Sequence, residues 1–533
     1  MRKTIVILGA GLAGLSAALQ AVKNECEVKL ISSMPSERAQ SVMAEGGINA
    51  ALDTKGENDS PLQHYLDTVK AGCNLANPNA VWNMTQAAPK LIQDLYKMGV
   101  QFNVTEDGEL DLRPFGGQKK RRTAFAKSDT GKQLMTALID EVRKWEAKGK
   151  IERFNHHDFV TLLKKENTCY GCVVWDRYTR EEQNIAGNAV IIATGGMHGL
   201  FSNTTGSLAN TGEAVAELFR LGVPMANLEM IQYHPTTVEI GGKRMLISEA
   251  ARGEGGRLFS YKEDSKKRWY FMEEKYPELG NLMPRDITAR EIWKVGQNNK
   301  VYLDMTEISE EEIEKKLAGL REDCLIYLHK DICKEPIEVS PGIHYFMGGI
   351  YVDEKHRTGI KNLYAAGECC AQYHGANRLG GNSLLGAIYG GQVAVQTAVD
   401  EISNRDEKEN VLENFGYENR EGILQKASMK ASPQAMTQAA LKEIMQQAMA
   451  VVRKESTLKE AEKKLYKMEG CDEGFLLLSQ AMLESALARQ ESRGAHWRED
   501  YPKQRDDKFL KTTVARYDGT RISIAFEEIP ERR

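Results

Sequence analysis

Three glycines at the end of a strand-like run near the start of the chain constrain the fold more than any other feature. The apolar run Thr4–Leu8 is typical of a buried strand. Gly9, Gly11 and Gly14 follow it, and an amphipathic pattern predicts a helix over Ala13–Val22. The first glycine permits a tight turn, the second lets backbone amides approach a pyrophosphate, and the third lets the helix pack on the strand. We therefore predict a dinucleotide-binding βαβ unit, with a glycine-rich turn in another α/β protein as the alternative.

The kind of dinucleotide follows from strands that come later. The acid that usually binds a ribose after the second strand, here Val28–Ile31, is replaced by Ser32. Two further strand-like runs end in glycine far along the chain, and the residues at their ends include Thr194, Gly195, Gly196 and Glu368. A discontinuous site of this kind suits FAD better than NAD, because the isoalloxazine ring must be held well away from the adenosine.

The bulk composition is that of an ordinary globular protein. The 533 residues suffice for about three to four structural units, and the net charge of −4 gives no reason to expect nucleic acid or an anionic membrane as a partner. No run of about 18 apolar residues occurs, so we expect no direct membrane insertion. Arg2 and Lys3 before an apolar run resemble a secretory signal, but a signal peptide has no need of the glycines.

The cysteines favour a reduced, cytoplasmic setting. There are nine, an odd number without the spacing of a disulfide framework. Cys169 and Cys172 have the spacing of a redox or metal site, but no second cysteine pair or nearby histidine completes one. They follow 166–168 and precede a strand-like run, so we predict a structural hairpin turn there and no metal site.

Changes in pattern divide the chain into five segments. Residues 1–229 and 345–404 contain the strand–glycine patterns, and 230–344 has an irregular α+β pattern with charged loops, which indicates an inserted domain. Residues 405–495 are predicted to be helical, because apolar residues recur at spacings of three and four, and 496–533 form a polar tail with two strand-like runs. Further helices are predicted at 62–71, 80–98 and 375–391, and a hairpin within 151–174.

Six sequence runs resemble the flavoprotein subunit of fumarate reductase and succinate dehydrogenase, within a superfamily that includes L-aspartate oxidase. They occur in the family's order, and the similarity extends nearly from end to end. The runs are Gln232–Thr236, Ser248–Gly256, Pro284–Asp286, His344–Gly349, His374–Ser383 and Glu491–His496. The resemblance implies an α/β fold: a Rossmann-like FAD-binding domain in two parts, an α+β capping domain inserted at 230–344, a C-terminal helical domain and a small C-terminal tail domain.

The resemblance also implies a small dicarboxylate substrate, fumarate or succinate, held by two separated anion clamps. By family position, His234 and Ser248 would hold one carboxylate, and His344 and Arg378 would hold the other. Arginine suits this role because its fork can donate two parallel hydrogen bonds to a planar carboxylate. A structural role is the alternative for each histidine taken singly.

The implied reaction is hydride transfer between flavin N5 and one alkene carbon, with protonation of the adjacent carbon. Arg285 matches the family's proton donor, and Glu249 with Arg252 matches its relay to solvent. An arginine has a pKa above about 12, but a carbanion beside a carboxylate is a strong enough base to accept its proton. A plain structural salt-bridge cluster is the alternative for these three residues.

Flavin contacts carry over by the same resemblance. Gly46 and Gly47 would lie beside the ring, and Glu213 stands where the family usually has aspartate. Glu368 would contact the ribityl chain. Ser383 and Leu384 complete the set.

Two departures from the family affect the expected chemistry. Respiratory members carry a histidine that bonds covalently to the flavin, and Gln40 occupies that position. We therefore expect non-covalent, dissociable FAD and a bias towards alkene reduction. Ser248 replaces a threonine, which keeps the hydroxyl and leaves a slightly roomier pocket.

The alternatives are L-aspartate oxidase, a soluble enoate reductase of the same superfamily, and a flavin-binding structural subunit without turnover. The oxidase has a glutamate where this chain has Phe115, and an aromatic ring pairs poorly with a substrate ammonium group. Retention of both clamps and of Arg285 argues against a structural subunit.

The electron source must be external, because the chain lacks the clustered cysteines that hold iron–sulfur centres. By resemblance, the partners are an iron–sulfur subunit and, through it, a membrane anchor. We expect a cytoplasmic protein, with any position at the inner face of the membrane depending on those subunits.

Overall fold

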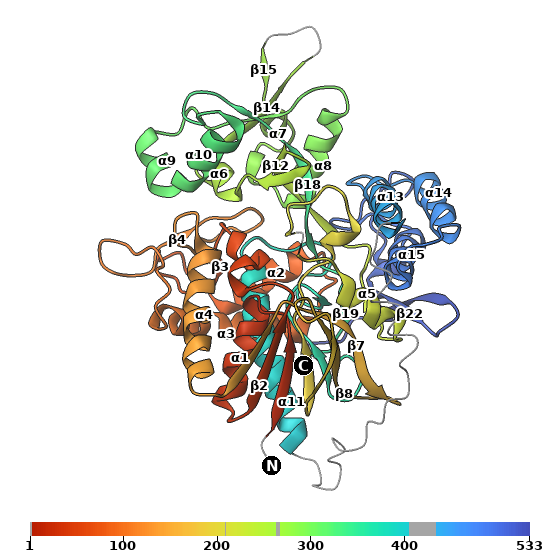
Figure 1. Ribbon diagram of the computed structural model, residues 1–533. Coiled ribbons are helices and arrows are strands. Elements are labelled where there is room, and N and C mark those ends of the chain that lie inside the picture. The colour runs from red at the N-terminus through yellow and green to blue at the C-terminus, as the bar shows by residue number, and fades with distance from the viewer. Residues whose placement is uncertain (1–2, 208, 263–266, 404–432, 533) are drawn as a thin grey trace.

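The computed structural model describes residues 3–207, 209–262, 267–403 and 433–532, and Figure 1 shows the arrangement of their elements. A five-stranded parallel sheet contains β1 (Thr4–Leu8), β2 (Glu27–Ser32), β6 (Ile151–Asn155), β10 (Ala189–Ile192) and β20 (Leu363–Ala365). Its spatial order is β6-β2-β1-β10-β20. In chain order this is 3-2-1-4-5, the order of a dinucleotide-binding fold, so the predicted Rossmann-like core is confirmed.

Side chains alternate across the parallel sheet because successive residues of a strand face opposite sides. Ile5 and Ile7 belong to a core with helices on one face, whereas Val6 and Leu8 belong to the core on the other face. The helices on the first face include α1 (Leu12–Lys23), α3 (Pro78–Lys97), α4 (Thr130–Ala147) and α11 (Asn382–Ser403). The opposite face is covered by an antiparallel sheet of β7 (His157–Lys165), β8 (Thr168–Asp176) and β9 (Glu182–Ala186).

The inserted segment has its own apolar core, drawn in green at the top of Figure 1. One of its sheets contains β12 (Ile231–Ile240), β13 (Lys243–Leu246) and β18 (Ser340–Phe346), and the other contains β14 (Arg257–Tyr261), β15 (Arg268–Trp269), β16 (Tyr302–Asp304) and β17 (Ile337–Glu338). Its helices are α6 (Glu249–Gly253), α7 (Phe271–Lys275), α8 (Arg285–Gly296), α9 (Glu310–Lys316) and α10 (Ala318–Asp323), followed by a π-helix at Cys324–Leu328. We call this segment the cap, and the described residues of 1–229 and 345–404 the base.

The C-terminal helices and strands pack on the base. The helices are α13 (Pro433–Ala448), α14 (Glu455–Tyr466), α15 (Glu473–Ala488) and α16 (Asp506–Phe509). The two strand-like runs of the tail are β22 (Lys511–Tyr517) and β23 (Ile522–Glu528). They extend a mixed sheet with β11 (Met225–Ala226), β19 (Gly349–Tyr351) and β21 (Cys370–Ala371), so the tail is joined to the base by strand pairing.

The remaining elements belong to the base, except for one 3-10 turn of the cap, Gly280–Leu282. They are α2 (Pro61–Ala71), α5 (Glu213–Arg220), the short strands β3 (Ile48–Asn49), β4 (Leu112–Arg113) and β5 (Thr123–Ala124), and 3-10 turns at Ser36–Arg38, Gln40–Met43, His198–Leu200 and Gly280–Leu282. The predicted helices at 62–71 and 80–98 are confirmed as α2 and α3. Part of the predicted helical segment, 404–432, lies outside the described residues, and the five segment boundaries remain predictions.

Two local predictions were wrong in detail. The glycine-rich helix expected from 375 begins only at Asn382, because Gly375 and Gly381 have φ angles of +54° and +83°, which no right-handed helix can include. The predicted hairpin turn lies just before Thr168, so Cys169 and Cys172 are buried inside β8 rather than in the turn. Within the part of the chain that the structure describes, no group of three histidine, cysteine or acidic residues could hold a metal ion.

Helix α11 packs against α1 at a glycine, and this contact supplies a test of the fold. A Cβ on Gly391 would lie 2.3 Å from the Ala13 carbonyl oxygen, whereas a Cβ on Gly296, the last residue of α8, would meet nothing within 4 Å. We expect Gly391→Ala to lower the free energy of unfolding by about 1–3 kcal/mol despite the better helix propensity of alanine. Gly296→Ala should leave the Tm unchanged or slightly raised. Equal Tm values for the two variants would contradict this packing.

Candidate active site

One cavity of about 330 Å³ runs from the glycine turn of the base to the cap. The carboxyl ends of parallel strands meet at one edge of a sheet, and in folds of this topology ligands bind there. Of the predicted site residues, those that line the cavity are Gly9, Gly11, Ser32, Gln40, Gly46, Gly47, Phe115, Thr194, Gly195, Glu213, His234, Ser248, Glu249, Arg285, His344, Glu368, Arg378, Ser383 and Leu384. Three predicted site residues do not line the cavity: Gly14, Gly196 and Arg252.

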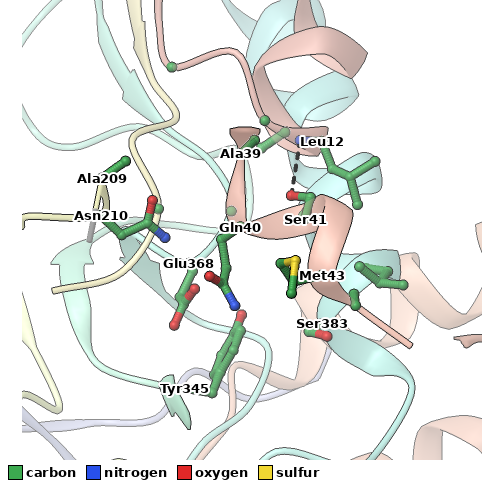
Figure 2. Close-up of a pocket in the computed structure, with 18 of the residues that line it drawn as sticks. Leu12, Ala39, Gln40, Ser41, Met43, Ala209, Asn210, Tyr345, Glu368 and Ser383 are labelled. Carbon is green, nitrogen blue, oxygen red and sulfur yellow. Dashed lines mark hydrogen bonds between the residues drawn. The ribbon is translucent and has the colours of Figure 1, made fainter. Parts of the chain in front are cut away.

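The turn after β1 leaves no room for side chains. Gly9 has a φ of +112°, and a Cβ there would lie 2.1 Å from the Ala193 carbonyl oxygen. A Cβ on Gly14 would lie 1.8 Å from the Gly9 carbonyl oxygen. Gly11, the N-cap of α1, has no side chain that could cap the helix, and the first residues of the helix line the cavity. Leu12 N makes a long contact of 3.4 Å with Ser41 Oγ (Figure 2). Such a helix start is a site for phosphate oxygens.

The ends of the neighbouring strands line the same part of the cavity. Ser32 Oγ donates to Asn155 Oδ1 at 3.2 Å, which joins the ends of β2 and β6. Glu368 accepts a hydrogen bond from Phe346 N at 3.1 Å, and His198 Nε2 lies 3.5 Å from the same carboxylate. Thr194 Oγ1 is buried and has no hydrogen-bond partner among the residues that the structure describes. A ligand with hydroxyl and phosphate groups would satisfy it.

Two glycines form a flat part of the wall beside Phe115. A Cβ on Gly46 would lie 2.7 Å from Phe115 Cζ, and one on Gly47, whose φ is +134°, would lie 2.5 Å from the Thr123 methyl group. Arg113 Nε donates to the Gly46 carbonyl oxygen at 2.9 Å and holds this backbone in place. A planar ring system fits against such a surface, so the glycine turn, the uncapped helix and this wall together fit FAD.

Gln40 lies within the cavity wall at the start of a 3-10 turn. Its Oε1 accepts a hydrogen bond from Ser207 N. Figure 2 shows its side chain directed towards Tyr345, with Glu368 beside it. A carboxamide contains no nucleophilic nitrogen that could bond to a flavin ring.

Two histidines face each other from neighbouring strands of the cap. His234 is on β12 and His344 on β18, and their ring centroids are 5.1 Å apart. His234 Nδ1 lies 3.0 Å from the Thr236 carbonyl oxygen, and His344 Nδ1 lies 2.8 Å from Thr205 Oγ1. Burial, and then the charge of Arg285, hold the pKa of both imidazoles well below the ordinary value, so both are neutral near pH 7.

Arg378 faces the cavity from the base. Its guanidinium carbon lies 4.3 Å from the centre of the Tyr345 ring, a cation–π contact. Burial, with repulsion from Arg285 as the next cause, lowers the pKa of Arg378 to about 9, so it is still cationic at pH 7. Its Nε atom is buried without a hydrogen-bond partner in the described part of the chain. Ser248, which is 3% exposed, caps α6 on the cap side of the cavity.

A buried ion pair, Arg285 with Glu249, lines the same cavity. Arg285 donates from Nε and Nη2 to Glu249 Oε2 at 2.8 and 2.6 Å. Glu249 Oε1 accepts from Gly116 N at 3.1 Å, and Arg252 Nη2 lies 3.8 Å from it. Burial acts to raise the pKa of Glu249, but Arg285 and Arg252 together hold it below its ordinary value, so the carboxylate is ionised.

The third member of the predicted relay is enclosed. The Arg252 side chain is fully buried and donates from Nη1 to the Asn281 carbonyl oxygen at 2.8 Å. Its Nε and Nη2 have no hydrogen-bond partner among described residues. Arg252 therefore touches neither the cavity nor the protein surface, and its part in a relay remains a prediction.

Sequence reasoning missed Glu45, which lines the cavity directly before the glycine pair. Burial raises the pKa of Glu45 to about 8; Asp323 of the cap acts in the same direction and Arg113 opposes it. Its Oε2 is buried without a partner in the described residues. The sequence does place an acidic residue next to a predicted flavin-contact glycine, which could have drawn attention to Glu45. The effect of Asp323 could not be foreseen, because only the fold brings this residue of the cap close to Glu45.

Glu45 gives a pH dependence of stability. With a folded-state pKa of about 8 against an ordinary 4.5, the folded protein retains a proton that the unfolded chain loses, so stability falls as the pH rises between these values. Glu45→Gln should match the parent near pH 4.5 and unfold at higher Tm above pH 8. The expected gain at pH 8.5 is at most about 4–5 kcal/mol, because a pKa difference of one unit corresponds to about 1.4 kcal/mol. The matched control is Glu106→Gln, at an exposed glutamate, compared at equal flavin occupancy. A gain that does not grow with pH would contradict the raised pKa.

Comparison with known proteins identifies the family. The FAD-binding domain family matches residues 4–384, and the C-terminal family of fumarate reductase flavoproteins matches residues 473–531. The succinate dehydrogenase flavoprotein subunit of Bacillus subtilis is 40% identical, over 97% of this chain and 94% of that protein. The fumarate reductase flavoprotein subunit of Mycobacterium tuberculosis is 33% identical, over 97% and 95%.

A solved structure agrees with these relatives. A variant of the Escherichia coli quinol fumarate reductase subunit FrdA superposes with a TM-score of 0.86 at 28% identity, over 99% of this chain and 97% of that chain. The match covers base, cap and C-terminal region together. The chain therefore belongs to the family of fumarate reductase and succinate dehydrogenase flavoprotein subunits, FAD-dependent oxidoreductases named for their action on fumarate and succinate.

Proposed function

We propose that this chain is the catalytic flavoprotein subunit of a fumarate reductase or succinate dehydrogenase that favours fumarate reduction. The observation that supports the proposal is that His234, Ser248, Arg285, His344 and Arg378 line one cavity, which also includes the glycine turn that fits FAD. Fumarate is a rigid dianion whose carboxylates lie at opposite ends of a double bond. The proposed arrangement, with His234 and Ser248 at one carboxylate and His344 and Arg378 at the other, would suit that shape.

The clamps divide the charge unequally. His234 and Ser248 would bind one carboxylate through neutral donors, because burial keeps the imidazole uncharged and the tautomer in which Nδ1 accepts from Thr236 N has its proton on Nε2. Arg378 with His344 would bind the other through a cation. Stronger attraction at one end draws electron density along the conjugated system, which stabilises charge that develops in the transition state. The rigid stacking of Arg378 on Tyr345 favours one fixed position for that carboxylate.

Arg285 is proposed to supply the proton. FAD, when bound, supplies the hydride for one alkene carbon. The Arg285 guanidinium is fixed by Glu249 at Nε and Nη2 and lines the cavity, so its remaining N–H groups can reach a substrate between the clamps. Glu249, ionised beside Arg285, could accept a proton that enters from solvent and pass it to the deprotonated guanidine after turnover.

The FAD is proposed to be non-covalent. Gln40 lines the flavin-side cavity and engages Ser207 N, and its amide cannot alkylate the ring. Without a covalent link, which in the respiratory members raises the flavin potential, reduction of fumarate is favoured over oxidation of succinate.

Electrons are proposed to arrive from an iron–sulfur subunit that is itself linked to a membrane anchor at the inner face of the membrane. The described residues contain no cluster of metal ligands. None of the helices in the described ranges is long and apolar enough to cross a bilayer. A separate iron–sulfur subunit would supply the metal centres, and its membrane anchor would supply the membrane-spanning helices.

Substitution of Arg285 tests the proton donor. Arg285→Ala should lower kcat for fumarate reduction by reduced viologen, measured without oxygen, by at least about 100-fold. FAD content should not change. Lys294→Ala, at an exposed position of the same helix α8, is the matched control and should retain full activity. Full activity in Arg285→Ala, or peroxide formation from aspartate in the parent protein, would refute the assignment.

Acid precipitation tests the mode of flavin attachment. We expect trichloroacetic acid to release all flavin into the supernatant, because Gln40 offers no bonding atom. The FAD-loaded protein should also reduce fumarate faster than it oxidises succinate. A yellow pellet, or equal rates in the two directions, would contradict the non-covalent site and the bias that follows from it.

A further inference from the structure

Gln232 connects the two arginines of the site without entering the cavity. It lies on β12, two residues before His234, and it is fully buried. Its amide nitrogen Nε2 donates to Asn377 Oδ1 and to the Arg378 carbonyl oxygen, both at 2.9 Å. Its oxygen Oε1 accepts from Arg285 Nη1 at 3.3 Å. One side chain from the cap therefore contacts the base at Asn377 and Arg378. It also contacts the guanidinium of Arg285, which is proposed to deliver the proton.

The orientation of the Gln232 amide is forced by its neighbours. A backbone carbonyl oxygen can only accept hydrogen bonds, so the nitrogen must face Arg378 and the oxygen must face Arg285. The alternative orientation would place two oxygens against each other and Nε2 against a cation. Both N–H bonds and the oxygen of the amide have partners. Turning the side chain away would leave these buried groups without hydrogen bonds.

Arg285 needs a second anchor besides Glu249. Its Nε and Nη2 both donate to the single atom Glu249 Oε2, and a guanidinium held at one oxygen can pivot about that point. Gln232 Oε1 engages the third nitrogen, Nη1, from a different element. Two anchors on α6 and β12 define the plane of the guanidinium, and that plane determines where its free N–H bonds point.

The anchor is neutral, and its neutrality has a physical reason. Arg285 already has Glu249 as counter-ion, and burial, with repulsion from Arg285 as the next cause, lowers the pKa of Arg378. A second carboxylate between the two arginines would cancel charge needed to attract a dianion and would hold the Arg285 proton more tightly. An amide fixes the geometry without either effect.

We propose that Gln232 is a positioning residue that sets the plane of the Arg285 guanidinium relative to the carboxylate gripped by Arg378. The inference rests on the proposed function, because it concerns proton delivery to a dicarboxylate. It assigns Gln232 no contact with substrate, since Gln232 does not line the cavity. Its loss should therefore slow proton delivery more than it weakens binding.

Two variants of the FAD-loaded enzyme test this role. Gln232→Met keeps the length but removes both polar groups, and we expect kcat for fumarate reduction to fall about 10- to 100-fold, the effect of misplacing a reacting group by an ångström. The Kd of malonate, a non-reacting dicarboxylate, read from the flavin absorbance, should change less than about threefold. The solvent deuterium isotope effect on kcat should increase, because proton delivery becomes slower relative to other steps.

Gln232→Glu is the conservative variant, because a protonated carboxyl reproduces one donor and one acceptor. It should recover most of the lost kcat at low pH and lose it again as the pH rises, whereas Gln232→Met should show no such recovery. Gln480→Met, a buried glutamine on α15 away from the site, is the matched control and should behave as the parent.

The outcomes separate this inference from the proposed function. If the parent reduces fumarate and Arg285→Ala abolishes turnover, but both Gln232 variants keep the parental kcat and isotope effect, the positioning role is refuted. A parallel loss of FAD content and malonate affinity in both Gln232 variants would also refute it, in favour of a structural role. If the parent does not reduce fumarate, the proposed function itself fails.

Discussion

Several guanidinium groups buried around one carboxylate form the constraint on which the rest of the site depends. Arg285 and Arg252 lie against Glu249, and Arg378 lies within reach of its charge. Removing charges from water costs several kcal/mol each, and breaking such a pair typically costs about 3–5 kcal/mol. The cluster is stable only because Glu249, Gln232 and backbone carbonyls accept its hydrogen bonds. Arg378 Nε has no partner among the described residues, and because Arg378 lines the cavity, an anionic substrate could satisfy this donor.

The site exists only where cap and base meet. His234, Ser248, Glu249 and Arg285 come from the cap, whereas Arg378 and the flavin-side glycines come from the base. Burial between these two parts keeps the histidines neutral and makes the electrostatic attraction of the arginines stronger than it would be in water. The same burial produces the raised pKa of Glu45, where an acid of the base meets one of the cap. The packing of the cap on the base therefore both assembles the site and shifts the pKa values of its groups.

The C-terminal region supports this interface from behind. Arg489 Nε donates to Glu229 Oε1 at 2.7 Å, just before the first cap strand. Ala495 N donates to the Ala376 carbonyl oxygen at 2.9 Å, two residues before Arg378. The tail strands also extend a sheet of the base. The last run of the family resemblance, Glu491–His496, thus contacts the segment that contains Arg378 and helps to hold that segment in place.

Local sequence was sufficient for the elements whose spacing is encoded within a few residues. The strand–glycine–helix unit at 4–23, helices α2 and α3, the discontinuous strand ends and the family motifs were all predictable from it. It could not place the start of α11, because the positive φ angles of Gly375 and Gly381 are decided by their surroundings, and it contained no clear signal for α4. In the sequence, Gln232 appeared only as one residue of the run Gln232–Thr236. Its contacts with Arg285 and Arg378, 53 and 146 positions away in the chain, arise from packing of the cap on the base.

Sequence alone therefore determined the residue types and the cofactor class, since these follow from local spacing and chemistry. Only the tertiary structure decided which groups are buried together, because burial and charge coupling depend on distances between segments that the chain order does not specify.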